Sequence, residues 1–328
     1  HMTHPRLGRR TVLSAAVAAA CPAPSRAQPR TPDLVKLVVG LPPGSLPDVI
    51  ARTLAPHLAG RIAPAVVVEN RLGAGARLAV DSVLQGPRDG SQVLVTPSGV
   101  LTLAPHTFRT LSYRPFQDLQ PVSLLGRAGF SFCVGPLVDP SVRTLRDFAD
   151  WCRAHPAQAS YASLAAGSPP HFVGEMLKRA LQFDCTHVAG RNDPAPEVLG
   201  GQIAAMSKGS VDVSRLAGDP RLRVLANTGS ARWPHMPDTP TFAEQGVPDL
   251  DWLDWYGAYV PAGVPPGLAA KLSEAIGAAF GDPRFLEQWR TALLIAPEAS
   301  KPEELDRLGR ADLERWAGVV RVTGFVAE

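Results

Sequence analysis

The feature that most constrains the fold is an alternation of short apolar runs with amphipathic helical patterns, and this alternation occurs twice. From the first set we expect strands at 34–39, 65–68 and 92–95 with helices at 49–58 and 78–85. From the second set we expect strands at 130–134, 159–162, 186–188, 204–207 and 223–227 with helices at 145–154 and 172–181. Strands that alternate with helices predict parallel sheets with right-handed crossovers. We therefore expect two α/β units.

The C-terminal part carries too few elements for a third domain. A strand is expected at 255–260, followed by helices at 266–280, 283–294 and 302–320. We expect these elements to return to the first unit. Lobe 1 is then 28–130 with 251–328, and lobe 2 is 131–250. Two crossing connections, near 128–131 and 248–254, predict a hinge, and the interface between hinged lobes suits a captured ligand.

The N-terminal residues 1–27 are interpreted as a tag scar, His1-Met2, followed by a signal peptide. Arginines precede an apolar run of about ten residues that is too short to span a bilayer, and Ser25-Arg26-Ala27 suits cleavage before Gln28. The Arg9-Arg10 pair is compatible with the twin-arginine route. We expect a periplasmic protein. A short helix of a cytosolic protein and acylation at Cys21 are the alternatives.

Composition excludes several classes of protein. The formal net charge of +3 is small and dispersed, so nucleic-acid binding is not indicated, although it slightly favours an anionic ligand. Beyond the signal, Cys133, Cys152 and Cys185 allow at most one disulfide, and no Cys/His spacing suits zinc. Small buried side chains are the default interpretation of these cysteines. We expect no cofactor and no metal, and a monomer.

The most informative local sequence lies between the first strand and the first helix, and consists of Leu41, Pro42, Pro43, Gly44, Ser45, Leu46, Pro47 and Asp48. Ser45 and Asp48 have the spacing of a capping box, and Gly44 permits a tight turn. A helix N-terminus presents unpaired N–H groups that favour a carboxylate, and the Ser45 hydroxyl can donate as well. Asp48 is expected to order its own loop, because like charges repel.

The second unit repeats this arrangement. Its strand leads into residues 163–171, which include Ser163, Ala166, Gly167, Ser168 and His171. Ser168 is expected at the N-cap, with proline at the first helical position. Because ligands bind at the carboxyl ends of strands in open sheets, two such loops facing each other could hold the two ends of a dicarboxylate, or one carboxylate and a polar tail. Helix capping alone also explains both loops, and His171 is expected more as a packing residue than as a ligand contact.

Many ordered landmarks together make the chain resemble the substrate-binding proteins of tripartite tricarboxylate transporters, the Bug family, from about residue 34 onward. The landmarks are the Pro-Pro-Gly loop with Asp48, Val67-Val68-Glu69-Asn70-Arg71 with Gly73-Ala74-Gly75, Asp89-Gly90, Ser98-Gly99, Pro121-Val122-Ser123-Leu124-Leu125, Tyr161-Ala162-Ser163 with Gly167-Ser168 and His171, Leu199-Gly200-Gly201-Gln202, Pro237-Asp238-Thr239-Pro240-Thr241 and Pro261-Ala262-Gly263.

The resemblance implies a type II periplasmic-binding-protein fold, which is a two-lobed Venus flytrap of mixed, mostly parallel sheets with helices on both faces. It implies a small carboxylate held by the 41–48 and 163–171 loops through backbone amides, hydroxyls and waters, and delivery to membrane transporter subunits. Thr96 and Ser98, at the end of the third strand, are further candidates in lobe 1.

The chain also departs from the family pattern. Leu41 replaces the usual aromatic residue, Ser45 replaces a second glycine, and Ala204 and Lys208 stand where acids are common. We hypothesise that Lys208 lies near the cleft and favours a more anionic ligand. The alternative is a solvated loop lysine. The departures leave open that this pocket binds a different ligand or has lost binding.

Other functions are less well supported by the sequence. No nucleophile elbow, Walker loop or His-Glu-x-x-His occurs. Residues 73–78 begin like a dinucleotide fingerprint, but Leu78 stands in place of the third glycine. We therefore expect no enzyme. A receptor that presents its closed form to a membrane sensor protein, rather than to a transporter, remains the alternative.

Overall fold

The computed structural model describes residues 2, 32–189 and 193–326. The predicted tag scar and signal peptide lie outside the described residues, apart from Met2. Among the helices of the described part, none combines the length and apolar character that a bilayer crossing requires.

The strands form two five-stranded sheets. The first has the order β2-β1-β3-β10-β4 and the second has the order β7-β6-β8-β5-β9. The strands of the first sheet are β1 (Leu34–Val39), β2 (Ala65–Asn70), β3 (Gln92–Pro97), β4 (Leu119–Ala128) and β10 (Asp254–Pro261). Those of the second are β5 (Phe130–Val134), β6 (Ser160–Ser163), β7 (Thr186–Ala189), β8 (Ala205–Gly209) and β9 (Arg223–Asn227).

The sheets are mixed, as expected, and their antiparallel pairings follow one rule. In the first sheet β1 pairs parallel with β2 and β3, whereas β10 is antiparallel to β3 and β4. In the second, β6 is parallel to β7 and β8, whereas β5 is antiparallel to β8 and β9. In each sheet the antiparallel strand is the one that the chain enters directly after crossing from the other half.

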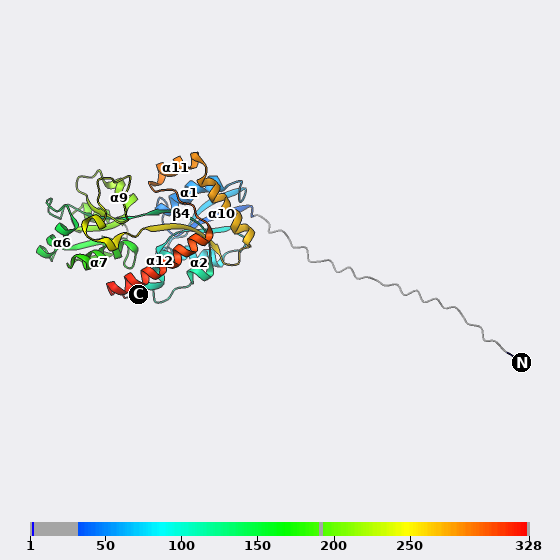
Figure 1. Ribbon diagram of the computed structural model, residues 1–328, viewed down its shortest axis with the longest axis horizontal. Coiled ribbons are helices and arrows are strands. Elements are labelled where there is room, and N and C mark those ends of the chain that lie inside the picture. The colour runs from blue at the N-terminus through cyan, green and yellow to red at the C-terminus, as the bar shows by residue number, and fades with distance from the viewer. Residues whose placement is uncertain (1, 3–31, 190–192, 327–328) are drawn as a thin grey trace.

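Helices cover both faces of each sheet, and Figure 1 shows the two halves side by side. Around the first sheet lie α1 (Leu46–Leu58), α2 (Arg77–Gln85), α3 (Gly99–Thr102), α4 (Ala104–Thr107), α5 (Pro115–Asp118), α10 (Pro266–Phe280) and α11 (Pro283–Leu293). Around the second lie α6 (Leu145–Ala154), α7 (Pro169–Leu181), α8 (Ala195–Leu199) and α9 (Ser210–Leu216). We call the two halves lobe 1 and lobe 2. The last helix is α12 (Pro302–Thr323).

Burial on both faces explains why the strands read as continuous apolar runs. In β1, Leu37 and Val39 belong to one buried cluster of lobe 1, and Val38 belongs to the cluster on the opposite face. Side chains alternate across a strand, so a sheet covered on both sides needs apolar residues at every position. Lobe 2 likewise has one cluster on each face of its sheet.

The chain crosses between the lobes at short connections. Gly129 alone separates the last residue of β4 from the first residue of β5. A Cβ atom on Gly129 would lie 2.9 Å from the ring of Trp233, so a larger side chain does not fit at this crossing. The chain returns between β9 and β10. The predicted crossings near 128–131 and 248–254 lie in or overlap these connections, and the hinge itself stays a prediction.

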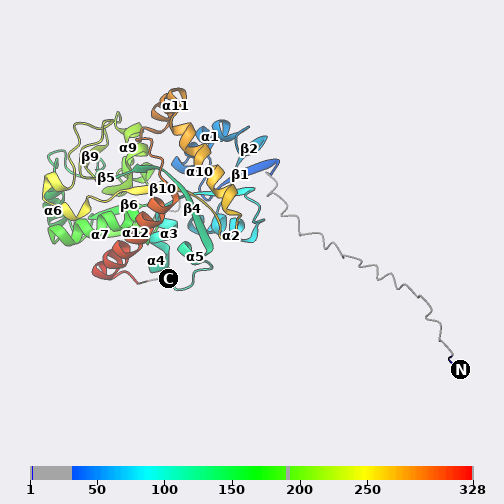
Figure 2. The ribbon, with the colours of Figure 1, turned by 45° about the vertical axis from the view of Figure 1, so that its right-hand side comes forward.

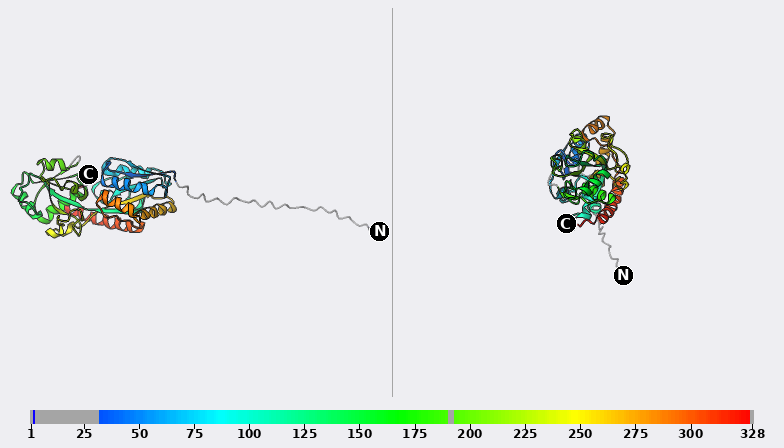
Figure 3. Two further views of the ribbon diagram at one scale, coloured as in Figure 1. Left: turned by 90° about the horizontal axis from the view of Figure 1, so that it is seen from above. Right: turned by 90° about the vertical axis from the view of Figure 1, so that its left-hand side faces the viewer.

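The helix α12 contacts both lobes, which differs from the expectation that residues 251–328 all complete lobe 1. Leu305, near its start, packs in a lobe 1 cluster, while Trp316, Val319 and Val320 pack in the main cluster of lobe 2. The apolar face of the helix is long enough to reach both cores, so the helix continues from lobe 1 onto lobe 2. Figures 2 and 3 show α12 running along the side of both halves.

Trp316 should be a principal anchor of α12 on lobe 2. It is 1% exposed, and its ring centroid lies 4.8 Å from that of Trp252 and 5.7 Å from that of Phe172. Trp316→Ala should therefore lower the free energy of unfolding by about 3–5 kcal/mol, as measured by urea denaturation. Val322→Ala, at a position 42% exposed on the same helix, is the control and should cost less than about 0.5 kcal/mol. Equal losses for the two variants would contradict this role of Trp316.

Candidate functional site at the junction of the lobes

The carboxyl end of β6 and the start of α7 meet lobe 1 directly. A Cβ atom added to Gly99, at the start of α3, would lie 3.0 Å from Cγ of Pro169. A Cβ atom on Gly167 would lie 3.2 Å from Cβ of Thr107. The predicted residues 98–99 of lobe 1 and 167–169 of lobe 2 are therefore brought together across the junction.

The predicted 41–48 loop lies against the same junction, although through an apolar contact. Leu41 and Leu46 pack against a buried cluster of lobe 1, and Val211, in the first turn of α9 of lobe 2, belongs to that cluster. The exposed part of the loop is formed by Pro42, Pro43 and Gly44.

Both loops are held by the same device, which is a hydrogen bond from a glycine N–H to the side chain four residues later. Gly44 donates to Oδ2 of Asp48 at 2.8 Å, and Gly167 donates to Nδ1 of His171 at 3.0 Å. The φ angles of the two glycines are +84° and +71°, a region that favours glycine. Each turn is therefore fixed by a buried side chain beneath it.

Asp48 is the centre of the lobe 1 loop. Its side chain also accepts from Nε of Arg52 at 2.9 Å and from Nδ2 of Asn70 at 2.9 Å. Burial alone would raise the pKa of Asp48, but the hydrogen bonds from Arg52, Gly44 and Asn70 outweigh burial and hold the pKa below its usual value. Asp48 therefore remains a carboxylate that orders its own loop, as predicted.

The predicted capping box at Ser45 is wrong. Ser45 occupies the N-cap position of α1, but its side chain makes no cap hydrogen bond. The carboxylate of Asp48 bonds to the N–H of Gly44 instead, because the left-handed turn at Gly44 brings that N–H over the helix start. The hydroxyl oxygen of Ser45 is left buried and without a partner among the described residues. A ligand oxygen is one group that would satisfy it.

The lobe 2 loop offers fewer donors than expected. Ser168 is the N-cap of α7 but does not cap it, and its hydroxyl donates to the carbonyl of Ala165 at 2.6 Å. Pro169 and Pro170 occupy the first two helical positions, and proline has no N–H. The first two positions of α7 therefore offer no backbone N–H to a ligand. Ala166 is exposed at the top of the turn.

Two stacked histidines support the lobe 2 loop from below. The rings of His171 and His187 are 4.0 Å apart, and Nε2 of His187 lies 2.8 Å from Oγ of Ser163. Burial lowers the pKa of both histidines, to about 4 for His187. Since Nδ1 of His171 accepts from Gly167, its neutral form carries the proton on Nε2. His171 is a packing and loop-fixing residue.

Thr96 and Ser98 are buried, and their hydroxyls are already committed. Thr96 donates to the carbonyl of Pro97 at 3.3 Å, and Ser98 donates to Oδ1 of Asp254 at 2.5 Å. Asp254 lies at the first position of β10, where the chain re-enters lobe 1. Burial, followed by the neighbouring charge of Asp312, raises the pKa of Asp254 to about 6, even though the bond from Ser98 acts to lower it.

Lys208 is not a solvated loop lysine, because it lies in β8 with a side chain that is 17% exposed. Its ammonium nitrogen is 3.0 Å from Oδ1 of Asp193 and 3.9 Å from Oδ2 of Asp212. The two acids balance its charge, so it does not supply an unpaired cation.

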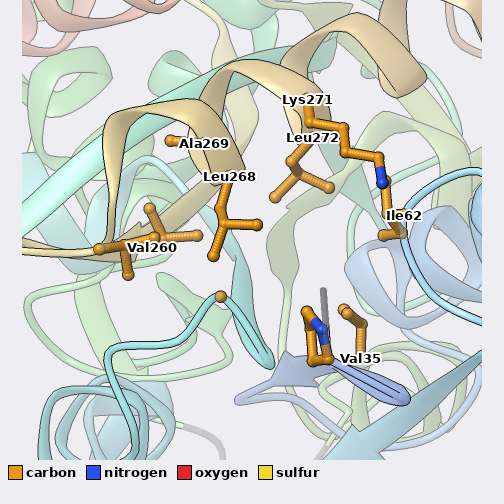
Figure 4. A pocket seen from close by; sticks show the side chains of 10 residues that line it. Val35, Ile62, Val260, Leu268, Ala269, Lys271 and Leu272 are labelled. Carbon is orange, nitrogen blue, oxygen red and sulfur yellow. The ribbon is translucent and has the colours of Figure 1, made fainter. Parts of the chain in front are cut away.

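Two hollows of lobe 1 lie away from these loops. One is lined mainly by aliphatic side chains between β1, β10 and α10, including Val35, Val260 and Leu268 (Figure 4). The other lies between β4 and α12 beside the ion pair of Arg127 with Glu298. Neither contains a residue predicted for the site.

Sequence reasoning missed His187 and Asp254, which hold predicted site residues in place, and Arg52 and Asn70, which hold Asp48. Of these, Asn70 lies in a landmark segment, and Arg52 could have been found from its spacing of four residues after Asp48 on one helix. No local pattern marks His187 or Asp254, because they meet Ser163 and Ser98 only through tertiary contacts.

Comparison with known proteins identifies the family. Residues 50–325 match the family described as the tripartite tricarboxylate transporter family receptor. The chain belongs to this family. It is 28% identical over 316 residues to protein BugT of Bordetella pertussis, a match that covers 95% of each chain.

Solved structures of the same kind are similar over most of the chain. The structure of R. palustris Rpa4515 with adipate has a TM-score of 0.81 and 25% identity, and covers 90% of this chain and 98% of that one. MatC from Rhodopseudomonas palustris with bound malate has a TM-score of 0.75 and 28% identity, and covers 88% and 98%. The family consists of solute-binding receptors and not of enzymes, and this tripartite tricarboxylate transporter receptor has their two-lobed fold.

The buried carboxyl of Asp254 makes stability depend on pH. Because the pKa of Asp254 is raised in the folded state, the folded state binds this proton more tightly than the unfolded state does. The free energy of unfolding therefore falls as the buried carboxyl ionises between about pH 4 and pH 6. Asp254→Asn should therefore raise the free energy of unfolding at pH 7, by up to about 3 kcal/mol, and this gain should vanish near pH 4. Urea denaturation across this range measures it.

Asp150→Asn is the matched control, since this carboxylate is 66% exposed on α6, and its effect should be small at every pH. A constant effect of Asp254→Asn between pH 4 and pH 7 would contradict the prediction.

Proposed function

We propose that this receptor binds a small carboxylate at the junction of its lobes and delivers it to a membrane transporter. The observation that carries the proposal is the unpartnered, buried hydroxyl of Ser45 at the start of α1, on the loop fixed by Asp48. A helix start combines unpaired N–H groups with a partial positive charge, and both favour an anion. The 13-residue α1 provides such a start.

The lobe 2 loop supplies the second half of the proposed site. The backbone N–H groups of Ala165 and Ala166 have no hydrogen-bond partner within the described residues, and this turn lies against lobe 1. We propose that they bind the far end of the ligand. The adipate of the Rpa4515 structure and the malate bound to MatC support a mono- or dicarboxylate of this size.

The mechanism is closure about the two crossings between the lobes. A ligand that bridges both loops stabilises the closed arrangement, because it interacts with both lobes only in that form. The closed receptor presents a composite surface of both lobes to its membrane partner. A signalling protein that reads the same surface is the second candidate partner. Pull-down from membrane extracts with and without ligand separates the two.

The proposal includes export. Residues 3–27 have the charge, apolar run and cleavage site of a signal peptide, and the family is one of periplasmic receptors. The twin-arginine pair makes transport of the folded chain the route to test. The mature protein, acting as a monomer, would begin at Gln28.

Ligand binding should stabilise the receptor. A thermal-shift screen of linear C4–C6 dicarboxylates, hydroxy acids and amino acids should raise the melting temperature by several degrees for at least one carboxylate. A ligand present at 100 times its Kd contributes about 2.7 kcal/mol to the stability of the folded state. A panel without any shift would contradict carboxylate binding.

Ser45→Ala should weaken the carboxylate found in this screen by about 10- to 100-fold in Kd, as measured by calorimetry. This corresponds to a charge-assisted hydrogen bond of about 1.5–3 kcal/mol. Ser141→Ala, which removes an exposed hydroxyl from the loop between β5 and α6, is the control and should leave Kd unchanged. An unchanged Kd in Ser45→Ala would remove α1 from the site.

A further inference from the structure

Two buried cysteines of lobe 2 lie side by side. Cys152, in the last turn of α6, is 1% exposed, and Cys185, directly before β7, is 3% exposed. The Cys152 thiol lies close enough to Cys185 to raise the pKa of Cys185. Both belong to the main buried cluster of lobe 2, and both are free thiols in the structure.

The packing around the two cysteines holds their backbones together from both sides. The guanidinium of Arg153, the residue after Cys152, donates to the carbonyls of Leu181 and Gln182, at 2.5 and 3.3 Å. The ring of Phe148, one turn earlier in α6, meets the ring of Phe183 edge-on at 5.8 Å. The end of α6 is therefore fastened to the segment that leads into Cys185.

The third cysteine lies elsewhere. Cys133 is in β5, opposite Met206 of β8, and its side chain packs in the cluster on the other face of the sheet. It is buried and free, so it provides a matched internal control for the pair.

We propose that Cys152 and Cys185 form a disulfide once the chain has reached an oxidising compartment, and that this bond joins the end of α6 to the start of β7. Intracellular thiols stay reduced, whereas exported proteins meet disulfide-form oxidants. Both thiols belong to one buried cluster, and the contacts of Arg153 and Phe148 hold the two backbone segments together, which is the arrangement that a disulfide needs.

The chemistry balances with a disulfide as the oxidant. One thiolate attacks a sulfur of the oxidant and releases one thiol, and the second thiolate then attacks the mixed disulfide and releases the other. The two cysteines lose two electrons and two protons in total, and the oxidant becomes two thiols. The neighbouring Cys152 thiol and burial both raise the pKa of Cys185, so the thiolate is scarce in the folded state. Oxidation therefore takes place in the folding chain or during opening of β7.

The position of the bond gives it a structural consequence. β7 is a short edge strand whose partner in the sheet is β6. It carries His187, whose ring contacts Ser163 and His171 beneath the lobe 2 loop. A covalent link at the start of β7 fixes this strand and so supports the loop.

The deciding experiment is a peptide map of the refolded chain. The protein is unfolded, refolded in a buffer of reduced and oxidised glutathione, blocked with iodoacetamide and digested with trypsin without reduction. Mass spectrometry should find residues 147–153 linked to residues 180–191 and lighter by two hydrogens than the sum of the two free peptides. Residues 128–143, with Cys133, should be found unlinked and blocked. Separate, blocked 147–153 and 180–191 peptides, or a link that involves Cys133, would overturn the proposal.

A stability measurement provides a second readout. Reduction of the oxidised protein with dithiothreitol should lower its melting temperature by several degrees, because the bond restricts the unfolded chain. Cys133→Ala should retain this difference between oxidised and reduced forms, and Cys152→Ala should lose it. If Cys152→Ala does not fold, the peptide map still tests whether the disulfide forms. The effect of dithiothreitol on the melting temperature of Cys133→Ala still tests its contribution to stability. A melting temperature that dithiothreitol leaves unchanged in oxidised protein would overturn the structural role of the bond.

Discussion

The proposed site depends on one hydrogen bond that occurs in both lobes, from the N–H of a left-handed glycine to a buried side chain four residues later. In lobe 1 the acceptor is the carboxylate of Asp48, and in lobe 2 it is Nδ1 of His171. Each bond fixes a strand-to-helix turn at the carboxyl end of its sheet. The turns are thereby shaped before any ligand is present, which lowers the ordering cost of binding.

The electrostatics of the junction favour recognition by dipoles over recognition by ion pairs. Lys208 is balanced by two acids, and Arg52 is engaged by Asp48. Asp254 accepts the hydrogen bond of the Ser98 hydroxyl, so this hydroxyl is not available as a donor to an anion. Of the loop residues that the structure describes, the hydroxyl of Ser45 and backbone amides remain for an anion. Such donors cost little reorganisation, and they select for the position of an oxygen more than for its charge.

Most helices and strands follow from local apolar periodicity in the sequence, whereas a few depend on tertiary contacts. The strands at 34–39, 130–134 and 223–227 and the helices at 145–154 and 266–280 lie where apolar periodicity predicts them. β4 was not predicted, because Pro121 and Gly126 interrupt its apolar pattern; its pairing with β10 supplies the missing order. The division of α12 between two cores was also missed, since an apolar stripe does not reveal which core it meets.

The candidate site shows the same division. The two loops could be located from glycine, serine and proline at strand ends, and Asp48 was correctly given the task of ordering its loop. The hydrogen bonds of the serine hydroxyls could not be predicted. Ser98 and Ser168 donate to partners that only the folded structure brings near, and Ser45 has no partner among the described residues. His187 and Asp254 were missed because their partners lie far away in the chain.

The most direct test of the account is a crystal structure of the receptor with the carboxylate that stabilises it most. We expect one carboxylate group within hydrogen-bond distance of the Ser45 hydroxyl and the start of α1, and the other end of the ligand against residues 165–168 of lobe 2. Density for the ligand in either hollow of lobe 1, with the 41–48 and 163–171 loops both free of contact, would contradict it.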